Sequence, residues 1–488
     1  MGHWLSQWTL LGVPLTTWLI GLWTVSSIFL TTWVILQRRA PVSTLAWIML
    51  LNLMPVVGVI IYAYFGPQRV KRQRLRRWHT RAALMSQADM RALRADRPEP
   101  PLWALQHARL IEQSCGLPPS SCQHLALLTN GGATLDALLR EIGQARAHIH
   151  LEYYIFEPDT TGQAVLRALT ERARAGVRVR LLVDAIGSPR LSSRRGQEHL
   201  ADYLAAGGQF AVFHPTRLDR IRPLVNLRTH RKIAVFDGAT GMLGGINVTD
   251  DENERVLPDT AYRDTHLLMR GGAVRWLQYL FLQDWTYAGG SPAQDEDLLP
   301  AEAAPATPGV PVQIVASGPD NDGEAIHRAM IDALGMARER IWLATPYFVP
   351  TEPAWTALTN AALRGVQVKL IVPYRSDSMI VTAAARSYYK ELQEAGVLVF
   401  EYHSRMYHAK TLVVDRHYAM VGSANFDNRS FRLNFEVAAA VFDRGFNHQL
   451  AEAFDADLSH CQLVPKDRPV PPHQRLFEAV ARLASPLL

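Results

Sequence analysis

The first 66 residues differ from the rest of the chain in their pattern of hydrophobic and polar positions. Residues 9–36 contain no charged side chain, and residues 42–66 again contain none. Each run exceeds the roughly 20 apolar residues that a helix needs to cross a bilayer. The pattern therefore predicts two transmembrane helices within residues 1–66, joined by a hinge at residues 37–41. A pair of buried core helices is the alternative.

Flanking residues support the membrane interpretation and suggest an orientation. No Lys or Arg precedes the first apolar run, and the second run follows at once, which argues against a cleaved signal peptide. Aromatic residues typical of membrane interfaces flank the runs at Trp4, Trp8, Tyr62 and Tyr64. Residues 67–121 are predicted to be a basic juxtamembrane linker, whose charges begin with Arg69, Lys71, Arg72, Arg74, Arg76 and Arg77. Because positive segments stay inside, the hinge is expected outside and the rest of the chain in the cytoplasm.

Beyond residue 121 the pattern is typical of an α/β protein, and it repeats. A buried strand, an amphipathic helix and a second strand are predicted at residues 149–156, 162–175 and 177–183. The same order returns at residues 340–348, 353–363 and 365–372. The stretches AGVRVRLLV and RGVQVKLIV match almost position by position. We expect two similar lobes with mostly parallel sheets covered by helices. The predicted lobes are residues 122–288 and 312–488, with a linker rich in Pro, Ala and acidic residues at 289–311.

One motif occurs once in each lobe. Both copies read H-x-K-x4-D-x6-G-(G/S)-x-N. The first copy consists of His230, Lys232, Asp237 and Asn247, and the second consists of His408, Lys410, Asp415 and Asn425. A single such match is weak, since a histidine before a strand is usually structural. Two copies at matching places of a duplicated lobe favour a functional site.

The spacing within the motif indicates phosphate chemistry. On a strand, residues i and i+2 share a face, so each histidine and its lysine point to the same side. The paired small residues before each asparagine allow a ligand to approach the backbone closely. If the lobes pack face to face, both histidines, lysines and asparagines converge on one cleft. Such a cationic pocket with amide donors suits a phosphodiester.

Composition adds little to this picture. The formal net charge of +6 is compatible with an anionic membrane or a phosphate substrate. The three cysteines form no metal-binding CxxC pair, and no other metal motif is present. The acidic stretch at residues 250–254 is expected to be a solvated loop. We therefore predict neither a metal nor another cofactor.

The paired motif resembles that of the phospholipase D superfamily, and the N-terminal hairpin resembles the membrane anchor of bacterial cardiolipin synthases. Flanking matches to that family occur at residues 62–66 (YAYFG), 262–266 (YRDTH), 318–320 (GPD), 346–348 (PYF) and 428–436 (NRSFRLNFE). The resemblance covers nearly the whole chain. It implies two phospholipase D-like lobes packed around one active site, behind a transmembrane hairpin in the bacterial inner membrane.

The resemblance also implies roles for individual residues. It makes His230 the nucleophile that forms a phosphohistidine and His408 the general acid, although the sequence itself cannot distinguish them. Lys232, Lys410, Asn247 and Asn425 would hold the non-bridging phosphate oxygens. Asp237 and Asp415 belong to the implied catalytic set, but their position across a strand also suits bracing of the lobe. Each histidine needs an acceptor on its other nitrogen, for which Asp264 and Glu436 are the candidates.

The implied reaction transfers a phosphatidyl group between two phosphatidylglycerol molecules, giving cardiolipin and glycerol. A hydrolytic phospholipase D, or a transferase with another acceptor, would use the same residues. A nucleic-acid phosphodiesterase has little use for membrane spans, and no nucleic-acid partner is expected. A catalytically dead membrane scaffold would not need two intact motifs. The sequence leaves the oligomeric state open.

Overall fold

The computed structural model describes residues 9–10, 13–37, 41–54, 57–59, 61–62, 94, 97–193, 195–214, 227–291, 309–320 and 323–485. The chain divides into two compact units, Met1–Arg72 and Gln73–Leu488. The predicted basic cluster at residues 69–77, together with Trp4, Trp8 and Tyr64, lies outside the described residues. The same holds for most of the predicted linker at residues 289–311.

The N-terminal unit contains one long apolar helix and one shorter one. Helix α2 spans Leu15–Ile35 and follows the short strands β1 (Thr9–Leu10) and β2 (Val13–Pro14). Within the described part of the chain it is the one helix long and apolar enough to cross a membrane. Helix α3 spans Pro41–Leu53 and ends two residues before Pro55, because a proline disfavours helical conformation in the residue before it. Residues 57–59 and 61–62 are again helical. The described residues thus contain one candidate membrane-spanning helix, and the predicted transmembrane hairpin is not confirmed.

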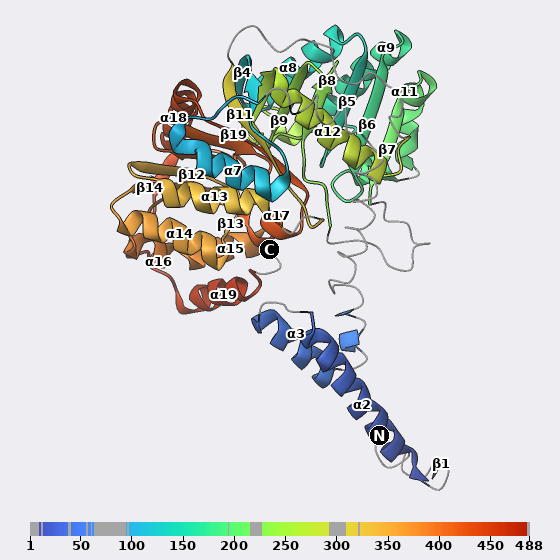
Figure 1. Ribbon diagram of the computed structural model, residues 1–488, viewed down its shortest axis with the longest axis vertical. Coiled ribbons are helices and arrows are strands. Elements are labelled where there is room, and N and C mark those ends of the chain that lie inside the picture. Colours follow the sequence, from blue (N-terminus) through green and yellow to red (C-terminus); the bar gives the residue numbers. More distant parts are fainter. Residues whose placement is uncertain are drawn as a thin grey trace. The chain divides into compact units, whose positions relative to one another are not determined.

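Two sheets form the framework of the second unit (Figure 1). The first sheet has the strand order β4 (His124–Thr129), β10 (Thr265–Arg270), β9 (Thr240–Gly244), β8 (Ile233–Phe236), β5 (His148–Tyr153), β6 (Arg178–Asp184) and β7 (Gln209–Phe213). The second has the order β20 (Cys461–Leu463), β15 (Leu398–Tyr402), β14 (Gln367–Pro373), β12 (Arg340–Ala344), β16 (Thr411–Val414), β17 (Tyr418–Gly422), β19 (Glu436–Val441), β11 (Val310–Ser317) and β3 (Ser120–Cys122). Strands β13 (Phe348–Val349) and β18 (Phe426–Asp427) pair separately.

The two sheets share one topology, which confirms the predicted duplication. Read from β4 to β7, the first sheet has the same order as the second read from β11 to β15. In each lobe three strands run parallel, β5–β6–β7 and β12–β14–β15, while the others pair antiparallel. The expectation of mostly parallel sheets is therefore wrong. The sheets are mixed because each motif contains a tight turn, where Asp237, Gly238 and Asp415 adopt positive φ and the chain folds back as a hairpin.

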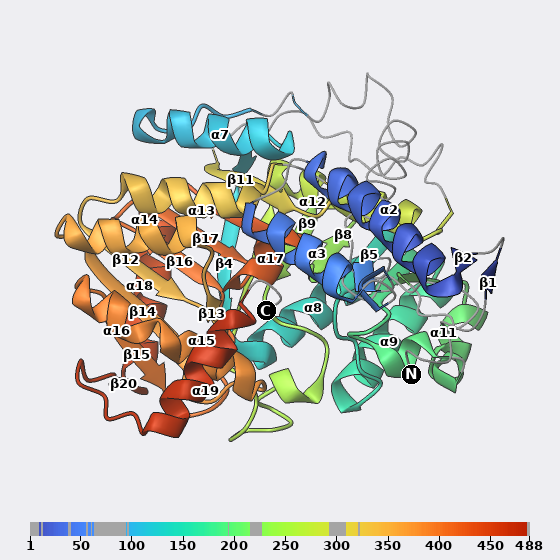
Figure 2. The same ribbon diagram turned by 90° about the horizontal axis from the view of Figure 1, so that it is seen from below.

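Helices cover both sheets in the same pattern. In the first lobe they are α8 (Asn130–Gln144), α9 (Thr160–Arg174) and α12 (Gly272–Tyr287); in the second they are α13 (Ala325–Met336), α14 (Glu352–Leu363) and α18 (Arg444–Leu458). Helix α7 (Leu105–Cys115) lies beside α13 over the second sheet (Figures 1 and 2). The second lobe also carries α15 (Met379–Ser387), α16 (Tyr389–Glu394), α17 (Asn428–Arg432) and α19 (Pro472–Leu483). Short helices α10 (Pro189–Ser192) and α11 (Ala201–Ala205) lie in the first.

A shared hydrophobic core joins the two lobes. Alternate residues of β8 face opposite sides, as expected for a strand. Ile233 and Val235 pack in a large cluster with the second lobe, whereas Ala234 and Phe236 pack with α8 and α9. Residues of α7 belong to the same shared cluster, and β3 pairs with β11 at the edge of the second sheet. The described end of the predicted juxtamembrane linker is thus packed onto the second lobe, and the predicted lobe boundaries stay predictions.

Candidate active site

Both motif histidines lie in one pocket between the lobes. The pocket has a volume of about 430 Å³. His230 precedes β8 and His408 precedes β16, so each stands where its chain enters the centre of a sheet. The asparagines of both motifs line the same pocket, together with Tyr154, Arg228, Tyr262, Tyr347, Asp377 and Arg429.

Each histidine is bound to a buried carboxylate from the other lobe. Nδ1 of His230 lies 3.0 Å from Oε2 of Glu436, which stands at the start of β19 in the second lobe. Nδ1 of His408 lies 2.6 Å from Oδ2 of Asp264, which precedes β10 in the first lobe. Both acids are the partners that the sequence predicts from their place downstream of each motif. The structure brings each one to the histidine of the opposite motif.

Backbone contacts between the lobes hold these pairs in register. The amide of His230 donates to the carbonyl of Phe435 at 2.9 Å. By the matching contact, the amide of His408 donates to the carbonyl of Arg263 at 2.8 Å. In each case the accepting carbonyl immediately precedes the carboxylate that binds the imidazole. The backbone contacts that join the lobes therefore also place each acid beside its histidine.

Burial and neighbouring charges together determine the protonation of the two histidines and the two acids. Burial lowers the pKa of His230 and of His408, and the facing carboxylates oppose that shift. Burial would raise the pKa of Asp264, but the charges of Lys410 and His408 hold it at about 2. Burial likewise works against ionisation of Glu436, yet His230 keeps its pKa below the ordinary value. Both acids are therefore ionised at neutral pH and hold an N–H at Nδ1, which leaves Nε2 of each imidazole for chemistry.

The motif lysines lie behind the histidines and do not line the pocket. Lys232 donates through Nζ to the carbonyl of His230 at 2.8 Å. Lys410 lies 3.2 Å from Asp264 and 2.9 Å from Nδ1 of His408. Burial, reinforced by the charge of Lys410, lowers the pKa of Lys232 to about 7. Both amino groups thus lie beneath the imidazoles, with that of Lys232 only partly protonated near neutral pH, and direct contact with phosphate stays a prediction.

The two motif asparagines differ in their surroundings. Asn247 is held on both sides, since its Oδ1 accepts from the amide of Ile155 at 3.0 Å and its Nδ2 donates to Glu252 at 2.6 Å. Glu252 is itself buried and lines the pocket, so the expectation that residues 250–254 form a solvated loop is wrong for this residue. Oδ1 of Asn425 is buried without a hydrogen-bond partner among the described residues. Phosphate binding by either asparagine stays a prediction.

The small residues before each asparagine make room for protein groups, which differs from the predicted approach of a ligand. A Cβ on Gly245 would lie 2.3 Å from Oδ2 of Asp264. In the second lobe the matching Ser423 donates through its hydroxyl to Glu436. The small residues of G-(G/S) thus accommodate Asp264 in one lobe and hydrogen-bond Glu436 in the other.

The motif aspartates lie at the far end of their strands, away from the pocket. Asp237 accepts from the backbone amides of Arg146, Ala147 and His148 at 2.7–2.9 Å. Asp415 accepts in the same way from three successive amides that begin at Arg338. These contacts fasten the start of the neighbouring strand in each lobe. A catalytic role for either aspartate does not agree with this placement, and we assign both to bracing.

The residues around the two histidines differ, although the surrounding scaffold is duplicated. Arg228 and Arg429 lie near Tyr154, whose ring is 5.0 Å from the imidazole of His230. Beside His408 the ring of Tyr262 lies 5.6 Å away. Tyr347 adds a phenol that donates to Asp377 at 2.6 Å. Sequence reasoning assigned no role to Tyr262, Tyr347 or Arg429, although they lie within the stretches noted for their family resemblance at residues 262–266, 346–348 and 428–436.

One group in this pocket has the composition of a metal site. Within the described ranges, Glu252, Asp264 and His408 bring possible ligand atoms within 4.8 Å of one another. These atoms are already used, because Glu252 binds Asn247 while Asp264 binds His408 and Lys410. The hydrogen bonds of this network account for the three side chains without a metal, and the metal-free reaction stays a prediction.

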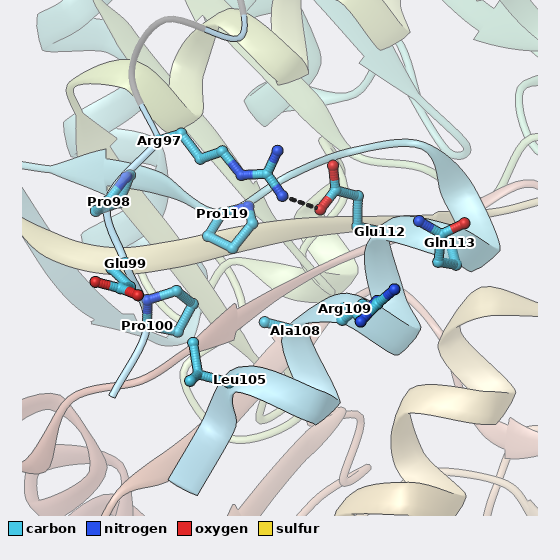
Figure 3. Close-up of a pocket in the computed structure, with 10 residues that line it drawn as sticks. All are labelled: Arg97, Pro98, Glu99, Pro100, Leu105, Ala108, Arg109, Glu112, Gln113 and Pro119. Carbon is cyan, nitrogen blue, oxygen red and sulfur yellow. Dashed lines mark hydrogen bonds and ion pairs between the residues drawn. The ribbon is translucent and has the colours of Figure 1, made fainter. Parts of the chain in front are cut away.

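A second pocket lies apart from the motifs. It has a volume of about 780 Å³ and is lined by residues 97–100, one side of α7 and Pro119 (Figure 3). Arg97 and Glu112 pair across it at 2.6 Å. Its lining holds no histidine and no motif residue, so it offers no comparable chemistry among the described residues.

Comparisons with known proteins agree with the duplicated architecture. The family model "Cardiolipin synthase, PLD-like domain" matches residues 138–258 and 330–458, one segment in each lobe. A second model, "Phospholipase_D-nuclease N-terminal", matches residues 22–67. Among solved structures, a phosphatidylserine synthase from Haemophilus influenzae Rd KW20 superimposes with a TM-score of 0.60. It is 16% identical and covers 78% of this chain and 100% of its own, which shows a shared fold.

Curated relatives extend the similarity along almost the entire chain. A "Cardiolipin synthase" from Geobacillus kaustophilus (strain HTA426) is 39% identical over 457 residues, 93% of this chain and 90% of the relative. "Cardiolipin synthase 2" from Bacillus anthracis is 37% identical over 467 residues, 93% of this chain and 88% of the relative.

Proposed function

The chain belongs to the cardiolipin synthase family of phospholipase D-like phosphatidyltransferases, and from this premise we propose that it transfers a phosphatidyl group from one phosphatidylglycerol to another. The products are cardiolipin and glycerol. The observation that carries the proposal is the pair of histidines in one pocket, each bound at Nδ1 to an ionised carboxylate. Two such imidazoles supply a nucleophile and a proton donor without further groups.

In the first step Nε2 of neutral His230 attacks phosphorus. The bond from phosphorus to the glycerol oxygen breaks, and protonated His408 gives its proton to that oxygen, leaving a phosphohistidine. The lowered pKa of His230 favours the neutral form that this attack needs. An anionic phosphate that enters the pocket raises the pKa of His408, which favours its protonated form.

In the second step neutral His408 takes the proton from a glycerol hydroxyl of the second phosphatidylglycerol. That oxygen attacks phosphorus, and the bond from phosphorus to Nε2 of His230 breaks. An anionic phosphate in the pocket also favours the protonated form of Lys232. The ammonium groups of Lys232 and Lys410 behind the imidazoles, together with Asn247 and Asn425, then stabilise the non-bridging oxygens as negative charge builds. The assignment of His230 as nucleophile follows the family resemblance.

The membrane arrangement belongs to the same proposal. We infer that residues 42–66 form a second span beside α2, with the hinge outside and both lobes in the cytoplasm. Within the N-terminal unit, Asn52 donates to Thr31 at 3.2 Å and Gln37 donates to Tyr62 at 2.7 Å, and these two contacts support the proposed hairpin. Reporter fusions at Arg39 and at the C-terminus test this orientation. The same side for both positions would refute the hairpin.

A lipid assay tests the reaction. Purified enzyme receives phosphatidylglycerol alone, and His230→Ala and His408→Ala serve as controls. Cardiolipin and glycerol formed by the wild type and by neither variant support the proposal. Phosphatidic acid as the main product would make the enzyme a hydrolase. No turnover of this lipid would overturn the substrate assignment and direct the search to other phospholipid donors.

A further inference from the structure

The C-terminal helix α19 presents a row of large apolar side chains to solvent. Leu476, Phe477, Val480 and Leu483 are 67%, 47%, 53% and 81% exposed. Their positions i, i+1, i+4 and i+7 place them on one face of the helix. A helix that keeps such a face in water requires an explanation, because scattered single exposures are common but a contiguous row is not.

The opposite face of α19 is fixed to the wall of the active-site pocket. Helix α19 packs along α15 (Figures 1 and 2). Ala481 belongs to a small cluster with Val381 and Val349, and both valines line the pocket. The hydroxyls of Tyr388 and Ser485 add a contact of 3.2 Å at the end of the helix. The exposed row therefore has a defined position one layer from the pocket.

Further exposed apolar side chains lie on α15, next in sequence to residues that line the pocket. Asp377 and Val381 line the pocket, and Met379 and Ile380 stand between them in sequence. These two side chains are 81% and 49% exposed. We call the six exposed residues Met379, Ile380, Leu476, Phe477, Val480 and Leu483 the α15–α19 apolar surface. It borders the pocket that holds both histidines.

We propose that the α15–α19 apolar surface lies in the headgroup region of an anionic phospholipid bilayer and presents lipid to the pocket. It is a membrane contact separate from the N-terminal apolar helix. The inference rests on the proposed function for its lipid substrate. The pocket is about 430 Å³ and is lined mainly by polar side chains, so it fits a headgroup. The acyl chains must then remain in the bilayer, and the bilayer must meet the protein beside this pocket.

Charge at the helix agrees with an anionic surface. Arg475 is exposed on α19, whereas the acidic Glu478 is buried and paired with Arg468 at 2.7 Å. An amphipathic helix with apolar and basic exposed groups is the usual form of an interfacial contact with anionic lipid.

Depth of insertion is the direct test, and it needs no turnover. The full chain with Cys461→Ser and Val480→Cys is labelled with an environment-sensitive fluorophore and placed in nanodiscs containing phosphatidylglycerol. Cys115 and Cys122 are buried and should not label. We expect a blue-shifted emission that spin-labelled phospholipid quenches. The same label at Asp202→Cys, an exposed position on α11, should stay unquenched.

Two results of this test would overturn the proposal. The first is a label at position 480 that stays exposed to water in the nanodisc. The second is cross-linking between copies of the chain through the thiol introduced at position 480, which would make the surface a dimer contact.

Activity supplies a second test with a matched control. Leu476→Glu combined with Val480→Glu should lower the rate on bilayer phosphatidylglycerol about tenfold. The rate on short-chain, monomeric phosphatidylglycerol should change less than twofold. Leu204→Glu, at an exposed leucine of α11, should affect neither rate. Equal losses on both substrates would overturn the proposal. A wild type that is inactive on both would refute the proposed function, while the fluorescence result would still decide the membrane contact.

Discussion

Replacing Asp264 by asparagine perturbs one histidine–carboxylate pair without changing its shape. Asp264 is fully buried and accepts from His408 at 2.6 Å and from Lys410 at 3.2 Å. With asparagine there, protonated His408 would face a neutral amide in a buried site. Removing one partner of a buried ion pair costs about 3–5 kcal/mol. Each 1.4 kcal/mol is a factor of about ten in rate, so we expect kcat for cardiolipin formation to fall about 10²- to 10⁴-fold.

The assay separates the two chemical steps. A phosphatidyl ester of p-nitrophenol needs no proton on its leaving group. If His408 is the general acid, the Asp264→Asn enzyme should release a burst of p-nitrophenol at nearly the wild-type rate. Glu436→Gln, the matched change beside His230, weakens the nucleophile and should show no such recovery. Thermal unfolding of both variants checks that the lobes remain folded.

Two outcomes would contradict this reasoning in different ways. A kcat for Asp264→Asn within about threefold of wild type on phosphatidylglycerol would refute the role of the carboxylate. A burst restored in Glu436→Gln and absent in Asp264→Asn would exchange the roles of the two histidines and leave the pairing intact.

Three further predictions follow from the same geometry. Gly245→Ala places a Cβ 2.3 Å from the Asp264 carboxylate and should lower kcat at least about 100-fold. Gly143→Ala, at a position with open space around it, should leave kcat unchanged. Equal activities of the two variants would contradict the tight fit at Gly245. Asp237→Ala removes three hydrogen bonds to backbone amides and should lower the free energy of unfolding, measured by urea titration, by about 2–4 kcal/mol. The kcat per folded enzyme should stay within about threefold of wild type. A loss of kcat without destabilisation would contradict the bracing role. Burial lowers the pKa of Lys232 to about 7, whereas an unfolded lysine titrates near 10.4, so above pH 7 the unfolded chain holds a proton that the folded chain lacks. The stability of wild type relative to Lys232→Met should therefore rise with pH by up to about 1.4 kcal/mol per unit, and a constant difference from pH 7 to 9 would argue against a neutral lysine.

Much of the fold could be predicted from the spacing of hydrophobic residues and from the internal repeat of the sequence. The strand–helix–strand order at residues 149–183 and 340–372 agrees with the structure within a few residues. Strand direction was missed because hydrophobic runs look alike in parallel and antiparallel sheets. The turn residues Asp237 and Gly238 were the available signal, since D-G favours a hairpin.

The site was predictable as a set of residues but not as an arrangement. The chemistry of a catalytic imidazole predicted that each histidine needs an acid, and the acids downstream of the motifs, Asp264 and Glu436, were the candidates. It could not assign them across the lobes, because the contacts that do so join residues 144 and 206 positions apart. Burial of Glu252 was missed for a similar reason. Its acidic neighbours suggest solvent, and only tertiary packing places its carboxylate against Asn247.

The exchange of carboxylates between lobes also bears on how the chain comes to be active during its synthesis. A ribosome that has made the first lobe has produced His230 but not Glu436, which follows 206 residues later. The same partial product holds Asp264 without His408. The first lobe alone therefore contains no complete histidine–acid pair, and both pairs exist only after β19 has emerged and docked. A chain that ends before β19 therefore lacks the complete pair of histidine–acid contacts that the proposed reaction with phospholipids needs.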